Sequence, residues 1–369
     1  MDALHALPPQ PDGVPWPTEQ WPTAKPAHGV DRGRLNELLD RLLADPAPEE
    51  LGHTHADAVV HRGALVVERY GRWFVGELEA LAGKEPGPVG ADDPLLSWSM
   101  AKSVLHAAVG IAVGDNRIDV AAPAPVATWS DPADPRHAIT WDHLLTMRPG
   151  LAWTEEYYEF AADDLPDVVT MLYGDGRQDM AAFAADFPLT DQPGSPEAYR
   201  YSSGTSNIVA AALQRTLGVG PDGMRAYLTE RLYSPLGMGS AVEDFDEVGT
   251  FVGSSFVYAT LQDWARFGLL ALRGGVWGDR ALLPDGWIDH GRRPRSQDDH
   301  AIHGAHWWAW EEPAAQALGI FGARGFEGQR IVCVPALDLV VVRLGKSPSA
   351  LQPALDAHLL QIVDCFTPS

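Results

Sequence analysis

The first repeating pattern of apolar residues along the chain predicts a helix followed by a β-hairpin. From Asp31 onward, leucines recur every three or four residues through 43, which places them on one side of a helix that begins near Asp31. Between 56 and 70, two short apolar runs flank Arg62-Gly63, a pair suited to a tight turn. We expect the helix to cover one side of the sheet that this hairpin begins.

The C-terminal part of the chain repeats this combination of strands and helix. Apolar runs at 331–334 and 339–342 predict two strands joined by a turn at 335–338. A final apolar helix is expected from about 351 to 366. Both ends of the chain therefore supply strands and a helix, and these can meet in one sheet.

The segment between the two ends is predicted to be an insertion of helices and loops, because its apolar runs mostly follow helical spacing. We therefore expect an α/β (α+β) protein with a Pro-rich arm at 1–30. A sheet subdomain would combine 31–96 with 311–369, and a mostly helical subdomain would occupy 97–310. Any active site is expected between these two subdomains.

The most apolar stretch of the chain lies directly after Lys102. Residues 103–113 are apolar on nearly every side, which is typical of a helix at the centre of a fold. Lys102 then lies in the first turn of a buried helix, where an ammonium costs several kcal/mol unless it is paired or loses its proton. Ser99, three residues earlier, shares a helical face with this lysine, whereas Ser97 does not.

Two interpretations of Ser99 and Lys102 remain open on this pattern alone. In the first, Lys102 helps to remove the proton of Ser99, and the helix N-terminus favours the anion that forms there. In the second, Ser99 caps the helix and Lys102 extends its stem toward solvent. A Ser-x-x-Lys motif is common by chance, so further residues must decide between them.

Composition and charge exclude several functional classes. The 27 basic and 50 acidic residues give a formal net charge of -23, so nucleic acid and anionic membranes are not expected as partners. The N-terminal residues do not resemble a signal peptide, and no apolar run reaches membrane-spanning length. Cys333 and Cys365 suit neither a disulfide framework nor a metal cluster. These features predict a cytoplasmic protein.

Two groups of histidines are weak candidates for a metal site. His53 and His55 form one group, and His300, His303 and His306 form the other. Neither group is accompanied by a carboxylate at a convincing spacing for a metal. We therefore expect neither a metal nor a cofactor.

A second chemical landmark is Tyr201, in a turn-rich loop at 193–204. This tyrosine comes just before a helix expected at 205–217, where it could point into a cleft or pack as an ordinary loop residue. A glycine-rich stretch at 322–329 follows and leads into the last strands. The chain thus contains Ser-x-x-Lys, then Tyr-Ser-Ser about a hundred residues later, then a glycine-rich stretch.

The order and spacing of these motifs resemble the penicillin-recognising serine hydrolases, the group of the serine β-lactamases and DD-peptidases. Within that group, the chain is similar to the class C-like esterases and 6-aminohexanoate-dimer hydrolases over most of 30–345. The resemblance implies a β-lactamase/transpeptidase-like fold, with an antiparallel sheet flanked by helices. The motifs that carry it are Ser99-Met100-Ala101-Lys102-Ser103, 139–151, Tyr201-Ser202-Ser203-Gly204, Ser234-Pro235-Leu236-Gly237-Met238, 259–268 and Gly325-Phe326-Glu327-Gly328-Gln329.

The resemblance implies a serine hydrolase that cleaves short linear amides or carboxylic esters through an acyl-enzyme at Ser99. Either Lys102 or a Tyr201 phenolate stabilised by Lys102 would take the serine proton, and Tyr201 would protonate the leaving group. The backbone N–H of Ser99 and a second N–H from 322–325 would hold the oxyanion. The sequence does not choose between amides and esters.

Two departures from the family pattern affect the expected substrate. Ser203 stands where many members have Asn, and no Lys-Thr-Gly precedes the last strands, although that motif usually holds the substrate carboxylate of β-lactamases and peptidases. We expect Ser203, Gly325 and Phe326 to contact a small-molecule amide or ester. A β-lactamase or DD-peptidase, and a non-catalytic binding module of the same fold, are the alternatives. A homodimer is also compatible with this picture.

An acidic loop at 155–159 completes the candidate site. In the dimer-hydrolase branch, a loop at this place resembles a mobile flap whose tyrosine reaches the scissile amide, and Tyr157 best fits that position. A phenol that donates to the amide nitrogen in the transition state favours amides over esters. The alternative is an exposed loop whose tyrosines only pack on the surface.

Overall fold

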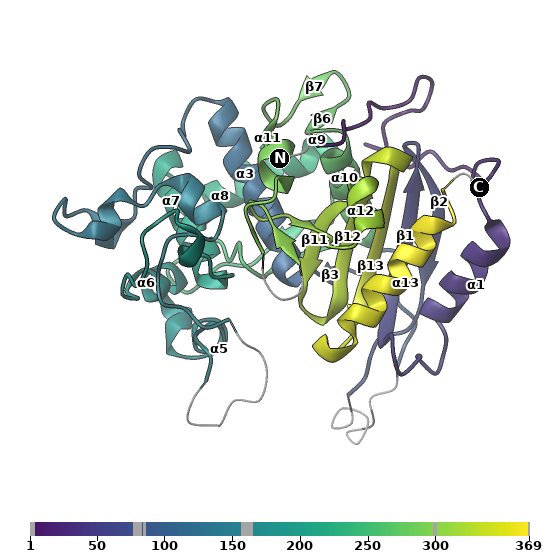
Figure 1. Ribbon diagram of the computed structural model, residues 1–369, viewed down its shortest axis with the longest axis horizontal. Helices are drawn as coiled ribbons and strands as arrows, with labels where there is room; N and C mark the ends of the chain where they lie inside the picture. Colours follow the sequence, from purple (N-terminus) through teal and green to yellow (C-terminus); the bar gives the residue numbers. More distant parts are fainter. Residues whose placement is uncertain (1–3, 77–82, 84–85, 156–164, 298–300, 368–369) are drawn as a thin grey trace.

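The fold is built on one antiparallel sheet with helices on both faces (Figure 1). The computed structural model describes residues 4–76, 83, 86–155, 165–297 and 301–367. Within them the sheet has eight strands in an order that places strands from both chain ends side by side. In spatial order they are β2 (Ala64–Tyr70), β1 (His53–His61), β13 (Leu339–Lys346), β12 (Gln329–Val334), β11 (Phe321–Gly325), β10 (Trp308–Ala309), β9 (Ile302–His303) and β8 (Ser296–Gln297).

Helices from opposite ends of the chain cover one face of this sheet. Figure 1 shows α1 (Arg32–Leu42), in purple, and α13 (Gln352–Asp364), in yellow, beside each other on that face. They enclose one apolar core with Val59 of β1 and Val341 of β13. The predicted sheet made from both chain ends and covered by terminal helices is confirmed.

The other face of the sheet carries the larger core and most remaining helices. Gly268 of α10 (Leu261–Leu272) lies so close to the sheet that a Cβ there would be 2.7 Å from Cγ1 of Val340, so the helix can pack directly on the strands. The further described helices are α3 (Ala101–Gly114), α4 (Trp141–Leu145), α5 (Asp167–Tyr173), α6 (Met180–Ala185), α7 (Ser203–Leu217), α8 (Pro221–Leu228), α9 (Ser234–Leu236), α11 (Trp287–Arg292) and α12 (Pro313–Ala317).

Local sequence signals explain the ends of the first elements. Asp31 caps α1, because its side chain accepts a hydrogen bond from the backbone N–H of Arg34. The turn between β1 and β2 consists of Arg62 at φ 53° and Gly63 at φ 75°. Two successive positive φ angles characterise the tight hairpin turn that matches the twist of the strands. The predicted helix start and hairpin are therefore both confirmed.

The sheet reaches further back along the chain than the sequence indicated. The segment 97–310 was expected to be mostly helical, yet β8, β9 and β10 lie within 296–309 and extend the sheet beyond β11. Each of these strands has only two residues, too few for the alternation of apolar and polar positions that identifies a strand. The boundary between the sheet and the helical insertion therefore lies before residue 296.

A small second sheet leads the chain into the central helix. In it, β3 (Leu95–Leu96) pairs with β5 (Val257–Ala259), which pairs in turn with β4 (Val242–Glu243). A third, two-stranded sheet joins β6 (Val276–Trp277) to β7 (Arg280–Ala281). Helix α3 follows shortly after β3 and is buried throughout 101–112, as the uniformly apolar stretch predicted. Among the described helices, none combines the length and the apolar character that a membrane span requires.

Candidate active site

A strained turn presents Ser99 at the N-terminus of the central helix. Residues 98–100 form a single 3₁₀ turn between β3 and α3. Trp98 has a φ of 45°, a left-handed conformation that bulky residues rarely adopt. Its indole packs edge-on against Phe326, with ring centroids 5.5 Å apart, and its Nε1 donates to Glu327 at 3.3 Å. Ser99 is partly exposed on this turn, so a substrate can approach its hydroxyl.

Ser97, the other serine at this turn, has a structural role. Its side chain is fully buried. Its hydroxyl accepts a hydrogen bond from the N–H of Val257 at 3.2 Å, and its proton lies within reach of two carbonyl oxygens, that of Trp98 at 2.9 Å and that of Ser255 at 3.2 Å. These contacts join the turn to β5 at Val257 and to the residues just before that strand.

Lys102 lies buried behind Ser99 with three hydrogen-bond acceptors around its amine. Its Nζ is 3.0 Å from Oγ of Ser99, 3.0 Å from Oγ of Ser203 and 2.9 Å from the carbonyl oxygen of Ser254. Burial lowers the pKa of Lys102 to about 8, and the charge of Glu155 opposes that shift. Near neutral pH, part of the protein therefore holds an uncharged amine beside the serine hydroxyl.

The structural alternative for this pair is wrong on both counts. Lys102 has only 2% of its surface exposed, so it does not extend to solvent. The residue at the N-cap of α3 is Met100, which makes no side-chain capping bond, and Ser99 does not cap the helix. The predicted contact between Ser99 and Lys102 is present instead.

Tyr201 approaches the lysine from the start of α7. Ser202 caps this helix by accepting the N–H of Thr205 at 2.8 Å, which keeps Tyr201 in the extended segment just before it. The Nζ of Lys102 lies 4.9 Å from the centroid of the Tyr201 ring. The ring also packs against Trp308 of β10, with centroids 5.1 Å apart. The fold thus brings Tyr201 beside Ser99 and Lys102, which lie on one continuous turn and helix about a hundred residues earlier.

Ser203 contacts a carboxylate that the sequence did not single out as a site residue. Oε1 of Glu155 accepts the hydroxyl of Ser203 at 2.5 Å. Its Oε2 accepts the backbone N–H of Ser203 at 2.8 Å and the indole N–H of Trp153 at 2.7 Å. Ser203 is the first residue of α7, where a carboxylate satisfies an unpaired N–H and complements the helix dipole. A negative charge therefore stands one hydroxyl away from Lys102.

Strand β11 forms the opposite wall of the site. Its whole length pairs with β12, whereas β10 pairs with it only at Phe321 and Gly322. Beyond Gly322, its outer edge faces the turn that carries Ser99. At Gly325, a Cβ would lie 2.3 Å from the carbonyl oxygen of Ser97, so glycine permits this close approach. Phe326 follows at once and packs on Trp98.

The histidines near this site are uncharged. His303 of β9 is buried, and burial together with the charge of Lys102 lowers its pKa to about 3. His306 is also buried, and the pKa of its ring is lowered well below the usual value, chiefly by burial. In the part of the chain that the structure describes, no three metal-binding side chains gather in one place. These rings therefore add no positive charge to the surroundings of Lys102.

Tyr157, the predicted substrate-binding residue of the acidic loop, lies outside the described residues. The other candidate site residues, Ser203, Gly325 and Phe326, border the turn that carries Ser99 or its lysine.

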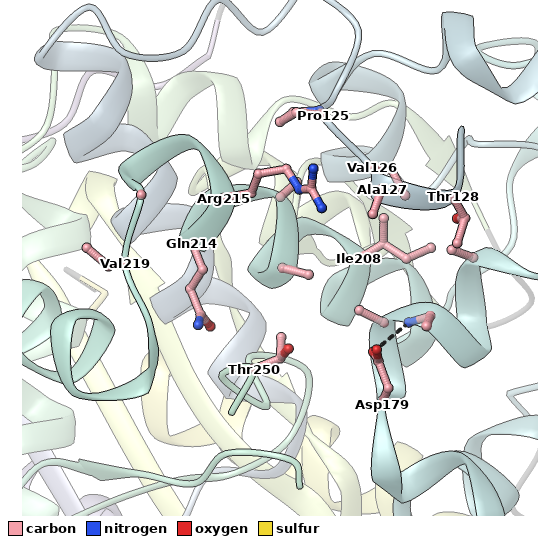
Figure 2. Close-up of a pocket in the computed structure, with 16 residues that line it drawn as sticks. Pro125, Val126, Ala127, Thr128, Asp179, Ile208, Gln214, Arg215, Val219 and Thr250 are labelled. Atoms are coloured by element: carbon pink, nitrogen blue, oxygen red, sulfur yellow. Dashed lines mark hydrogen bonds between the residues drawn. The ribbon is translucent and has the colours of Figure 1, made fainter. Parts of the chain in front are cut away.

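A cavity of about 500 Å³ is lined by none of these residues. Figure 2 shows the side chains that line it. It lies along the middle and end of α7, where Ile208 and Arg215 line it. Two of the polar side chains that line the cavity already make hydrogen bonds within the fold. Asp179 caps α6 by accepting the backbone N–H of Ala182, and Gln214 accepts the backbone N–H of Phe251. Because these polar groups already serve the fold, the site defined by Ser99 remains the stronger candidate for chemistry.

Comparisons with known proteins agree with this geometry. The beta-lactamase family model matches residues 53–363. A 6-aminohexanoate-dimer hydrolase of Paenarthrobacter ureafaciens is 25% identical over 339 residues, which are 88% of this chain and 80% of that protein.

Two solved structures share the fold. A Bacillus anthracis protein assigned as a 6-aminohexanoate-dimer hydrolase has a TM-score of 0.70 and 22% identity, covering 98% of this chain and 90% of its own. A Bacteroides dorei protein assigned as a β-lactamase has a TM-score of 0.63 and 17% identity, and the match covers 91% of this chain and 99% of that protein. The resemblance and the fold class inferred from the motifs are thereby confirmed. With its family model matched over most of its length, this chain belongs to the beta-lactamase family of serine hydrolases and is similar to the 6-aminohexanoate-dimer hydrolases within it.

Proposed function

We propose that this protein hydrolyses short linear amides or carboxylic esters through an acyl-enzyme at Ser99. The observation that carries the proposal is the 3.0 Å contact between the Ser99 hydroxyl and a buried Lys102 whose pKa is lowered to about 8. A serine hydroxyl is a weak nucleophile until a base takes its proton, and an uncharged amine at this distance is such a base.

The surrounding residues fit the remaining steps of acyl transfer. As Ser99 attacks the carbonyl carbon, the negative charge that develops on the carbonyl oxygen can be held by the N–H of Ser99 and an N–H from the outer edge of β11. Tyr201 can then protonate the departing amine or alcohol. Water attacks the acyl-enzyme in the second half of the reaction and restores the serine. No step needs a cofactor or a metal.

Aromatic side chains beside Ser99 support a linear, partly apolar substrate. Trp98 contacts Phe326 and Phe256, with ring centroids 5.5 and 6.0 Å apart, and Phe256 contacts Tyr173 at 6.4 Å. We call these four residues the aromatic wall. Such a surface suits a short methylene chain, and the similar P. ureafaciens protein is named for an amide with such chains.

The end of β11 does not offer the cation that would hold a β-lactam carboxylate. Arg324 lies 3.5 Å from Asp356 and 4.3 Å from the Trp310 ring, and so it is engaged with other groups. Glu327, just past the strand, is acidic and pairs with Lys346 at 3.1 Å. We therefore favour linear amides and esters over β-lactams.

Covalent labelling tests the proposal directly. The protein is treated with a fluorophosphonate or with a p-nitrophenyl ester, and its intact mass is measured. We expect one adduct, located on Ser99, and no adduct in Ser99→Ala. Labelling that persists in Ser99→Ala would show that another residue is the nucleophile, and a protein that forms no adduct with either reagent fits the binding-module alternative.

Turnover of three substrates separates the candidate activities. A linear aminohexanoate dimer, a short-chain ester and nitrocefin are compared under the same conditions. Turnover of either of the first two with little or none of nitrocefin supports the proposal. If nitrocefin is the fastest of the three, the protein is a β-lactamase and the proposed substrate class is wrong.

A further inference from the structure

The hydrogen bonds around Ser203 have a fixed direction. Its Oγ lies 2.5 Å from Oε1 of Glu155, a separation typical of an O–H that donates to a carboxylate. The carboxylate has no proton to give, and two oxygens this close repel each other unless a proton lies between them. The hydroxyl proton of Ser203 therefore points at Glu155. Toward Lys102, 3.0 Å away, Ser203 presents only lone pairs.

This direction determines where an uncharged Lys102 points its own lone pair. A neutral amine has two N–H bonds and one lone pair, arranged tetrahedrally. The carbonyl oxygen of Ser254, 2.9 Å from Nζ, can only accept, and Ser203 as oriented by Glu155 can only accept. Both N–H bonds are therefore used. The lone pair is left for the third partner, the hydroxyl of Ser99 at 3.0 Å.

We propose that Glu155 is a positioning residue that directs the lone pair of Lys102 toward Ser99, through the hydroxyl of Ser203. This inference rests on the proposed acylation of Ser99. In that step, the Ser99 O–H bond breaks and its proton forms an N–H bond with the lone pair of Lys102, which becomes an ammonium. The Ser99 oxygen forms a bond to the substrate carbonyl carbon, and the π electrons of the carbonyl move to its oxygen.

The isosteric variant Glu155→Gln reverses the direction of this chain. The position of Oε2 receives two N–H donors, from the Ser203 backbone and from Trp153, so the amide oxygen of the glutamine must take that place. Its NH₂ group then faces Oγ of Ser203 and donates to it. The hydroxyl proton of Ser203 is released to point at Lys102, where it occupies the lone pair that Ser99 needs.

Glu155→Gln also removes a negative charge, and that change alone would raise the acylation rate rather than lower it. The two effects of the substitution can therefore be told apart. This charge raises the pKa of Lys102, so removing it leaves more uncharged amine at neutral pH. If charge were the only role of Glu155, the glutamine variant would acylate as fast as the wild type or faster below pH 8. Within the residues that the structure describes, the other titratable groups facing Lys102 are Tyr201, His303 and His306, and the two histidines are held neutral by burial.

The experiment measures the burst of p-nitrophenol from a p-nitrophenyl ester between pH 6 and 9.5. Wild type is expected to acylate faster as pH rises, levelling off above about 8 as Lys102 loses its proton. For Glu155→Gln we expect the plateau itself to fall by about 100-fold, the scale of losing a positioned base, with no recovery at high pH. A plateau kept at the wild-type level, with the profile moved to lower pH, overturns the proposal.

A second background shows whether the loss acts through Ser203. In Ser203→Ala there is no hydroxyl to reorient, so adding Glu155→Gln should change the plateau by less than about threefold. An equal loss in both backgrounds overturns the proposal. Should Glu155→Gln fail to fold, judged by its melting temperature, Ser203→Ala alone decides: a loss of about tenfold in the plateau, with KM little changed, is expected, and wild-type acylation contradicts the proposal.

Labelling of the wild type separates this inference from the proposed function. If wild-type Ser99 forms no adduct, the proposed function fails. If it forms the adduct and Glu155→Gln keeps the full plateau, only the role of Glu155 fails. The matched control is Glu68→Gln. Glu68 also has a carboxylate that accepts a side-chain hydrogen bond, in this case from Gln262 at 2.9 Å. It lies on β2, an edge strand that three other strands separate from β11 beside Ser99. We expect its plateau to equal that of the wild type.

Discussion

Two buried ionisable side chains lie on opposite faces of the sheet, and they differ in their partners. Lys102 has three hydrogen-bond acceptors at 2.9 to 3.0 Å on the face that carries the large core. Asp57 of β1 lies on the other face, since Val59, two residues later in the same strand, packs under α1 and α13. Neither carboxyl oxygen of Asp57 has a hydrogen-bond partner among the described residues.

Burial moves both groups toward their uncharged forms, with different consequences. It lowers the pKa of Lys102 to about 8 and raises the pKa of Asp57 to about 7, although Arg69 and Arg343 partly oppose the second shift. The guanidinium of Arg343 donates its hydrogen bonds to other groups, among them the hydroxyls of Thr54 and Ser347. Burial is the largest cause of both pKa shifts, and the two groups differ in that only Lys102 has hydrogen-bond partners that fix its position beside a neighbouring hydroxyl.

Lys102→Met gives the largest expected effect on activity. Methionine fills a similar volume without an amine, so kcat/KM for a p-nitrophenyl ester should fall by about 1,000-fold or more. Stability should change by less than about 2 kcal/mol, because relief from burying a charge offsets the loss of three hydrogen bonds. Burst kinetics and chemical unfolding measure the two quantities. A variant that stays within tenfold of wild-type activity would remove Lys102 from the mechanism.

Asp57→Asn should produce the converse result, a change in stability without a change in activity. The folded carboxyl keeps its proton up to about pH 7, whereas the unfolded chain releases it near pH 4. The folded state is therefore favoured by this group below pH 4, and that contribution is lost as pH rises to 7. At 1.36 kcal/mol per pH unit, the loss is about 4 kcal/mol.

Urea unfolding of wild type and Asp57→Asn at pH 5 and pH 8 measures, as a difference, the part of this contribution that is lost between pH 5 and 7. That part is about 2.7 kcal/mol, and all other carboxylates are shared by the two proteins. We expect the variant to gain on the wild type as pH rises, while the rate of Ser99 acylation stays the same. If both proteins respond equally to pH, Asp57 is ionised or paired in the folded state, and the contrast with Lys102 is lost.

Which residues of the site could be predicted from the sequence depends on whether their contacts are local or long-range. Ser99 and Lys102 could be paired from sequence because a spacing of three residues fixes two side chains on one helical face. Glu155 could not, because it meets Ser203 across 48 residues through the way the fold brings α7 beside it. The burial of Asp57 could not be predicted either, because a single charged residue in an apolar strand is typical of a position that faces solvent.

The sheet and its covering helices were predictable for a related reason. The hairpin before residue 70 and the last two strands carry long apolar runs, and each run reports its own conformation. The two-residue strands β8, β9 and β10 carry no such signal, since only pairing with β11 and with each other defines them. The outer edge of the sheet, which borders the site, was therefore the part that sequence missed.

The smallest predicted effect concerns Tyr157, a residue expected to act on the substrate rather than on Lys102. If this tyrosine reaches the scissile bond, its phenol donates to the amide nitrogen as that nitrogen gains its lone pair in the transition state. An ester has no such nitrogen. Tyr157→Phe should therefore lower kcat/KM for a linear amide by about tenfold, or 1.4 kcal/mol, and leave a matched ester nearly unchanged.

The amide and the ester must share one acyl group for this test to be decisive. Both then form the same acyl-enzyme at Ser99, so deacylation and the positioning of Lys102 contribute equally to each, and only the leaving group differs. A loss confined to the amide assigns the hydrogen bond to the departing nitrogen. Equal losses on both substrates, or none on either, rule out this role, and Tyr158 becomes the next residue to substitute in the same pair of assays.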